Sequence, residues 1–140
     1  MKKVLLLISI VFVCSSTIAQ TAKEDYSKIL NIELGKDFEG KTVTIDAEFF
    51  GFGMANMRKP NKFKVGYMPF RCKEIDGEPL KNGFGGETGD FFFIKKKNES
   101  TNVVKNLKKG DKVTLTGEVF INNNLGYKQA NFIVYEITKF

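Results

Sequence analysis

The segment Leu107–Phe120, with the sequence LKKGDKVTLTGEVF, decides the fold. Gly110 and Asp111 form a polar turn that ends the preceding segment and starts a strand. After this turn, apolar or small residues alternate with polar ones, which places Val113, Leu115, Gly117 and Val119 on one side. A period of two is typical of a strand that has one buried face.

A similar segment, GKTVTIDAEFF, occupies residues 40–50. Both copies run from a glycine through a polar pair, Val-Thr, an aliphatic and a polar residue to a small residue before glutamate. In the upstream copy the pattern predicts a buried side made of Val43, Ile45, Ala47 and Phe49. The two copies therefore predict two matching strands of one small β-structure.

Three further strands are predicted from apolar runs and turn residues, so that the five cover residues 41–50, 62–74, 90–97, 111–122 and 127–140. In the second strand the apolar side changes at Pro69, which suggests a bulge or an edge position there. The glycine-rich residues 75–89 predict a long and mobile connection.

Two helices are also predicted. Residues 98–109 offer Asn98 or Ser100 as an N-cap and place Val103, Val104 and Leu107 inward. Residues 21–31 place Tyr26, Ile29 and Leu30 on one side of a short helix that packs on the domain. A flexible tail is the alternative for this second segment.

The element order β-β-β-α-β-β, together with the Gly110–Gly117 stretch, resembles the OB-fold, and most closely the small exported, periplasmic OB-fold domains of bacteria. The resemblance implies an all-β fold with minor α: a five-stranded OB-fold-like barrel over residues 38–140. A short N-terminal helix and linker at residues 20–37 precede it. Barrel closure leaves few unpaired strand edges. A β-sandwich or another small barrel is the alternative.

Residues 1–19 combine a basic start, an apolar run and the small residues Thr17 and Ala19. This pattern predicts a signal peptide cleaved after Ala19, and therefore a secreted or periplasmic protein, rather than a buried N-terminal element. Cys14 leaves lipidation open as the minority alternative, because Phe12 and Val13 stand where a lipoprotein signal has a small residue. Only lipidation at Cys14 would place the protein on a membrane.

The composition argues against catalysis. The chain has no histidine, which removes the commonest general base and most zinc sites. Cleavage would leave Cys72 as the single thiol, without a disulfide partner or an activating base. Asp46 and Glu48 share one side of a strand, which is ordinary for a solvated face. We therefore expect no enzyme activity, no cofactor and no metal site.

The OB-fold resemblance implies a ligand surface on the second and third strands and on the loops that follow the first and fourth. The candidate ligand-binding residues on these elements are Phe52, Met54, Met57, Arg58, Lys59, Lys64, Arg71, Phe92, Lys96, Asn123 and Tyr127, with Asn122 and Asn124 nearby. Aromatic rings beside cations suit a stacked base with a phosphate alongside. Two structural readings stay open: Phe92 packs under the N-terminal helix, and the asparagines supply turn geometry.

The predicted function is a non-catalytic binding module of the cell envelope or secreted space, whose partner is a protein, peptide or glycan. The alternative is a single-stranded nucleic-acid-binding protein. The formal charge of +6 falls to +4 without Lys2 and Lys3, since residues 1–19 contain no acidic residue. This mild basicity does not by itself imply nucleic acid, and export disfavours it.

Overall fold

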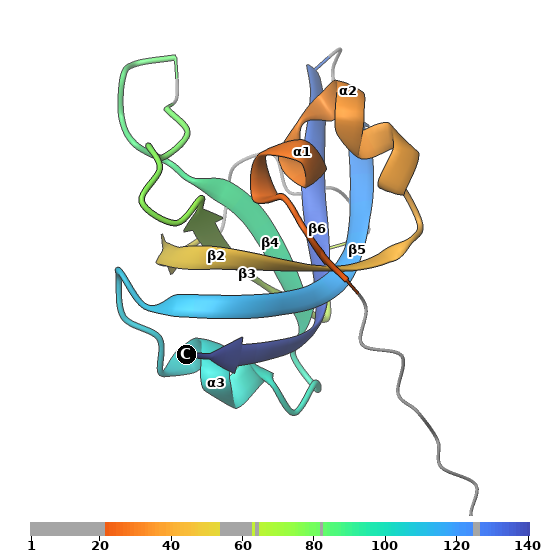
Figure 1. The fold of residues 1–140 in the computed structure, drawn as a ribbon. Coiled ribbons are helices and arrows are strands. Elements are labelled where there is room, and N and C mark those ends of the chain that lie inside the picture. Colours follow the sequence, from red (N-terminus) through yellow and green to blue (C-terminus); the bar gives the residue numbers. More distant parts are fainter. Residues whose placement is uncertain (1–21, 54–62, 64, 82, 125–126) are drawn as a thin grey trace, which may run out of the picture.

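The computed structural model describes residues 22–53, 63, 65–81, 83–124 and 127–140 (Figure 1). The strands are β1 (Lys23–Glu24), β2 (Thr42–Phe52), β3 (Tyr67–Lys73), β4 (Asp90–Lys95), β5 (Lys112–Asn124) and β6 (Tyr127–Lys139). The helices are α1 (Tyr26–Leu30), α2 (Ile32–Gly35), the 3-10 helix η1 (Lys36–Phe38) and α3 (Thr101–Lys105). None of the helices in these ranges is long and apolar enough to span a membrane.

The strands form one sheet in the order β1-β2-β3-β4-β6-β5, and pairing of β2 with β5 closes it into a barrel. The last five strands and α3 follow the predicted order, with the helix between β4 and β5 (Figure 1). The predicted five-stranded barrel is therefore confirmed, and a two-layer sandwich is excluded. The parallel strand β1, with Lys23 opposite Thr44 on β2, was not predicted.

The two similar segments, residues 40–50 and 110–120, form most of β2 and β5. These strands pair antiparallel, with Val43 opposite Gly117. Their predicted inward side chains are buried in the main core: Val43, Ile45, Ala47, Phe49, Val113, Leu115 and Val119. Gly117 lies where β5 crosses β6 closely, since a Cβ atom there would lie 2.0 Å from the carbonyl oxygen of Ile133. The pairing of β5 with β6 shifts register at this point.

The second strand is shorter than predicted. It begins at Tyr67 rather than near residue 62, because Gly66 adopts a φ of +82° and turns the chain. The bulge lies in β2 between Phe49 and Gly51, and not in β3 at Pro69. Pro69 instead lies where the pairing of β3 with β2 ends, the edge position at which a missing N–H is tolerated.

Helix α3 is also shorter than its predicted range. Val104 and Leu107 are buried as expected, whereas Val103 is exposed. The chain leaves the helix at Asn106 and enters a turn in which the Lys108 N–H donates to the Asp111 carboxylate at 2.8 Å. Local hydrogen bonding by the polar residues after the helix therefore ends it early.

The N-terminal segment is part of the barrel and not a tail. Asp25 caps α1 by accepting a hydrogen bond from the Ser27 N–H at 2.9 Å, and Asn31 caps α2. Tyr26 and Ile29 are buried in the main core. The predicted packing of a short helix on the domain is confirmed, although two helices share the segment.

Candidate functional site

One half of the barrel's outer surface is polar. On β2 and β5, the hydroxyls of Thr44 and Thr116 lie 3.0 Å apart, and Thr114 donates to Asp46 at 2.7 Å. Asp46 also pairs with Lys23 of β1 at 2.9 Å. These side chains satisfy one another through hydrogen bonds and an ion pair. We call this region the polar outer face.

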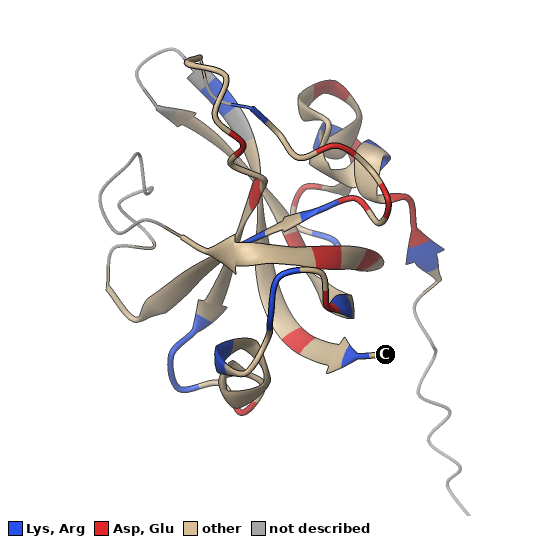
Figure 2. Ribbon diagram, turned by 90° about the vertical axis from the view of Figure 1, so that its left-hand side faces the viewer, with Lys and Arg blue, Asp and Glu red and all other residues tan. Residues whose placement is uncertain are grey.

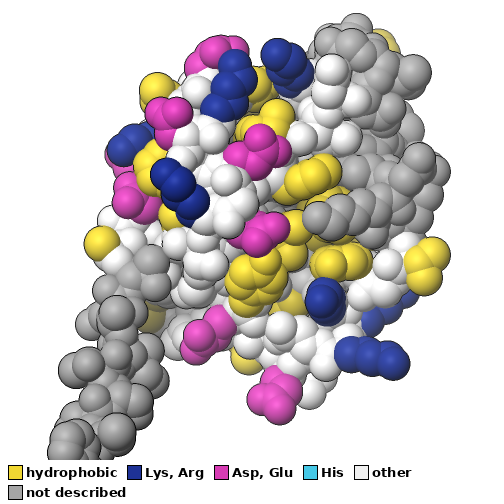
Figure 3. Space-filling model, turned by 90° about the vertical axis from the view of Figure 1, so that its right-hand side faces the viewer, with side chains coloured by type: hydrophobic (Ala, Val, Ile, Leu, Met, Phe, Trp, Pro, Cys, Tyr) yellow, Lys and Arg dark blue, Asp and Glu magenta, His cyan; other side chains and the backbone are white. Residues whose placement is uncertain are grey.

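The other half carries aromatic rings. A second hydrophobic cluster, separate from the main core, consists of Phe63, Tyr67, Phe91, Phe93, Phe120 and Ile133. We call it the aromatic outer face, because Phe91 and Phe93 alternate along β4 with the inward residues Phe92 and Ile94. Hydrophobic side chains also gather on the surface seen in Figure 3. Phe63, Phe93 and Ile133 are buried in this cluster, whereas Tyr67, Phe91 and Phe120 remain partly exposed. Partly exposed apolar side chains that lie together can contribute to an interaction site.

Phe63, from the connection between β2 and β3, is enclosed by three rings of this face. It stacks on Phe93 with the ring centroids 4.4 Å apart and the planes inclined by 12°. Tyr67 and Phe120 contact it edge-on, at 5.0 and 5.5 Å. Phe63 is fully buried there, so this ring of the chain itself covers the inner part of the face.

A pair of cations lies at one end of the aromatic outer face. Arg71 is opposite Phe91 in the pairing of β3 with β4. Its guanidinium carbon lies 5.4 Å from the centroid of the Phe50 ring, and the Lys109 ammonium lies 4.4 Å from the same centroid. We call Phe50, Arg71 and Lys109 the cationic end.

Figure 2 shows Lys and Arg along the turn from α3 to β5, which contains Lys109. This turn is joined to β2 by a hydrogen bond of 2.9 Å from the Gly110 N–H to the Phe49 carbonyl. The bond places Lys109 beside the end of β2, within reach of Phe50.

The structure brings together only some of the predicted site residues. Arg71 donates from Nε to the Phe52 carbonyl at 3.0 Å, so these two are neighbours. Lys96 is exposed in the turn after β4, and Asn123 is exposed on β5. The predicted residues Met54, Met57, Arg58, Lys59 and Lys64 lie outside the described residues, as do the side chains of Asn124 and Tyr127.

The placement of Phe92 on the ligand surface is wrong. Its ring is fully buried, 5.6 Å from the rings of both Phe70 and Phe132. Phe92 pairs with Phe70 on β3 and with Phe132 on β6, which both point inward, so its own direction is determined by its neighbours. Sequence reasoning therefore missed Phe91 and Phe93 as the outward rings. Ile94 is aliphatic and lies two positions after Phe92, on the same side of the strand. It was the available indication that this side faces the core.

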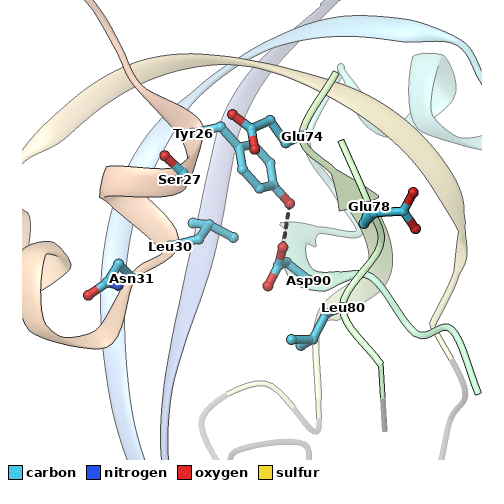
Figure 4. A pocket seen from close by; sticks show the side chains of 8 residues that line it. All are labelled: Tyr26, Ser27, Leu30, Asn31, Glu74, Glu78, Leu80 and Asp90. Carbon is cyan, nitrogen blue, oxygen red and sulfur yellow. Dashed lines mark hydrogen bonds between the residues drawn. The ribbon is translucent and has the colours of Figure 1, made fainter. Parts of the chain in front are cut away.

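A polar pocket of about 230 Å³ lies between α1 and the connection after β3 (Figure 4). It is lined by Tyr26, Ser27, Leu30, Asn31, Glu74, Glu78, Leu80 and Asp90. The Tyr26 hydroxyl donates to Asp90 at 2.7 Å. Burial raises the pKa of Asp90, and the hydrogen bond from Tyr26 only partly offsets this effect.

The described part of the chain places Cys72 and the side chains of the metal-binding types. Burial raises the pKa of the Cys72 thiol, which is fully buried and so held in its unreactive form. Among the described residues, no three side chains of the metal-binding types come close enough to hold a metal ion.

The Asp90→Asn variant is expected to be more stable than the parent protein at pH 7. The asparagine still accepts from Tyr26 but carries no buried charge. Since the folded-state pKa of Asp90 lies above the usual 3.8, protonation favours the folded state, and this contribution is lost as the pH rises through that raised pKa. The difference in unfolding free energy between the variant and the parent protein should therefore become smaller toward pH 4. Urea unfolding of both proteins between pH 4 and 8 measures this, and a pH-independent difference would contradict it.

Comparison with known proteins gives the fold but no family. No family model matches the chain, and no curated protein does. Among solved structures, an OBody (AM3L09) bound to hen egg-white lysozyme matches with a TM-score of 0.54 and 12% identity over 84% of this chain and 94% of the OBody. A second lysozyme-bound OBody (AM2EP06) matches with a TM-score of 0.53 and 12% identity over 83% of this chain and 91% of its own.

The mitochondrial single-stranded DNA-binding protein Rim1 of S. cerevisiae is a weaker match, with a TM-score of 0.46 and 10% identity over 74% of this chain and 95% of its own. At this level of similarity the comparison carries no functional information. The matches to the OBodies, together with strand order and barrel closure, show that the chain has the OB-fold.

Proposed function

We propose that the chain is a non-catalytic binding module that recognises a protein or peptide partner through the aromatic outer face and the cationic end. The observation that carries the proposal is the division of the barrel's outer surface. Strand β5 contributes to both halves, with Thr114 and Thr116 in one and Phe120 in the other, where Ile133 of β6 lies with it. Tyr67, Phe91 and Phe120 stay partly exposed around the buried Phe63 and Phe93, so apolar surface is available to a partner in this half.

A protein partner fits the charge distribution better than nucleic acid does. In the part of the chain that the structure describes, Lys and Arg are interspersed with Asp and Glu along the ribbon, without a continuous basic track (Figure 2). Binding to a phosphate backbone depends on such a track. The OBodies show that this fold can support protein recognition, since their structures contain bound lysozyme. Proteins are also bound commonly through exposed aromatic side chains.

The non-catalytic part of the proposal rests on the absence of histidine from the sequence and on the burial of Cys72. The cell-envelope or secreted setting rests on the signal-like sequence of residues 1–19. A glycan partner is the other ligand class that flat aromatic surfaces suit, and the test below separates it from a protein.

Photo-crosslinking from the two outer faces tests the proposal. A benzophenone amino acid is placed at Phe91 on the aromatic outer face and, as a control, at the exposed Thr138, which is opposite Thr114 of the polar outer face. In the producing cells, irradiation should give a discrete protein adduct from position 91 and none from position 138.

Equal labelling from both positions, or no adduct from position 91, would contradict this function. A carbohydrate-sensitive adduct would identify a glycan partner instead. Titration with a labelled single-stranded oligonucleotide at two salt concentrations covers the remaining alternative. Tight binding that weakens steeply with salt would favour the nucleic-acid function.

A further inference from the structure

We propose that the cationic end binds a carboxylate of the partner, so that the recognised segment is an acidic peptide that also carries apolar side chains. This inference rests on the proposed function and adds the chemistry of the partner. It depends on three features: the fixed position of Arg71, the open space beside it, and the lack of carboxylate partners for both cations.

Arg71 is held in place before any partner binds. Its Nε donates to the Phe52 carbonyl at 3.0 Å, and its Nη1 donates to the Thr88 carbonyl at 3.1 Å. The guanidinium also packs on the Phe50 ring. A preorganised side chain loses little conformational entropy when it binds a ligand.

The third nitrogen of Arg71, Nη2, remains available for a ligand. It lies beside Gly51, where a Cβ atom would come within 3.3 Å of it. A Cβ atom at residue 51 would meet no other atom of the described residues within 4 Å, so they leave this side of Nη2 uncovered. The two hydrogens on Nη2 can therefore reach an acceptor that approaches from outside the barrel.

The charges of both cations are uncompensated within the described part of the chain. The ion pairs found there use Lys23, Lys28, Lys36, Lys73, Lys112 and Lys139. Arg71 and Lys109 belong to none of them, and the Phe50 ring that both contact attracts cations without neutralising their charge. A carboxylate at Nη2 of Arg71 would form a charge-assisted hydrogen bond there, and the positive charge of Lys109 on the same ring would add to the attraction.

The neighbouring surface is apolar, which selects among anions. The Phe50 ring contacts the guanidinium, with its centroid 5.4 Å from the guanidinium carbon. Phe91 lies opposite Arg71 on β4. A carboxylate attached to an apolar group therefore fits better than an isolated inorganic anion.

The test is an amide-resolved NMR titration of the chain from Gln20 onward, which contains every described residue. The probes are phenylacetate and its cationic counterpart phenethylamine. We expect phenylacetate to shift the amides of Phe50, Phe52, Arg71 and Lys109 in a saturable manner, and phenethylamine to leave them unchanged. Lys109→Gln should weaken phenylacetate binding about two- to fivefold, the range of an exposed ion pair.

Lys105→Gln is the matched control, because it removes the same charge from the exposed surface of α3 and should leave the affinity unchanged. The inference is overturned if phenethylamine shifts the same amides as strongly, or if the two lysine variants behave alike. A short oligothymidylate that competes with phenylacetate would also overturn it, because the site would then bind phosphate of nucleic acid.

The crosslinking and NMR experiments can fail independently. A protein adduct at position 91 without phenylacetate binding would remove the carboxylate site and keep the binding function. Phenylacetate binding at the cationic end without any adduct at position 91 would keep the carboxylate site and remove the proposed binding function.

Discussion

The Gly117→Ala variant is expected to lose at least about 3 kcal/mol of unfolding free energy, a severe effect for a single methyl group. The added Cβ would lie 2.0 Å from the Ile133 carbonyl oxygen and 2.6 Å from a ring carbon of Phe132. Both contacts are on β6, so relief requires β5 and β6 to separate where they cross. Urea unfolding followed by circular dichroism measures the loss.

Gly83→Ala provides the control for this variant. A Cβ atom at residue 83 would meet no atom within 4 Å, and the residue does not require a left-handed backbone conformation. Its unfolding free energy should stay within about 0.5 kcal/mol of the parent value. If both alanine variants unfold at the same urea concentration, the close crossing of β5 and β6 is incorrect.

The Ile29→Ala variant is expected to lose about 2–5 kcal/mol. Ile29 is fully buried in the main core, although it lies in a segment that precedes all five barrel strands. Truncating it leaves a cavity under α1 at the end of the barrel. The same urea experiment measures the effect.

Leu34→Ala is the control, because it tests whether truncating any apolar side chain in this segment lowers the unfolding free energy as much as Ile29→Ala does. Leu34 lies on α2 and is 50% exposed, so its replacement should change stability by no more than about 0.5 kcal/mol. Equal and small effects of the two variants would mean that the N-terminal segment behaves as a tail. Such a result would contradict its place in the barrel.

The repeated alternation in β2 and β5 was sufficient to identify the barrel's inward residues, because a strand with one buried face records that face in its own sequence. The turn at Gly110 and Asp111 and the helix before it could also be placed from local signals. The same reasoning failed in β4, where Phe91, Phe92, Phe93 and Ile94 are apolar on both sides. A pattern without polar residues cannot say which side faces the core.

The candidate site was only partly predictable. Phe52 and Arg71, both predicted site residues, are neighbours in the structure because β2 pairs with β3. Lys109 was missed because it lies in a different connection, more than 30 residues along the chain from Arg71. The Tyr26–Asp90 hydrogen bond joins residues 64 positions apart, and no local pattern indicates such a pair.

The sequence alone therefore determined the order of strands and helices along the chain, the turns that contain glycine and the inward residues of β2 and β5. These features depend on interactions between neighbours along the chain. The tertiary structure decided which rings of β4 face outward, where Phe63 stacks and how Arg71 and Lys109 meet at Phe50. These features depend on the register between strands that are distant in sequence. Register is the outcome of packing the whole barrel.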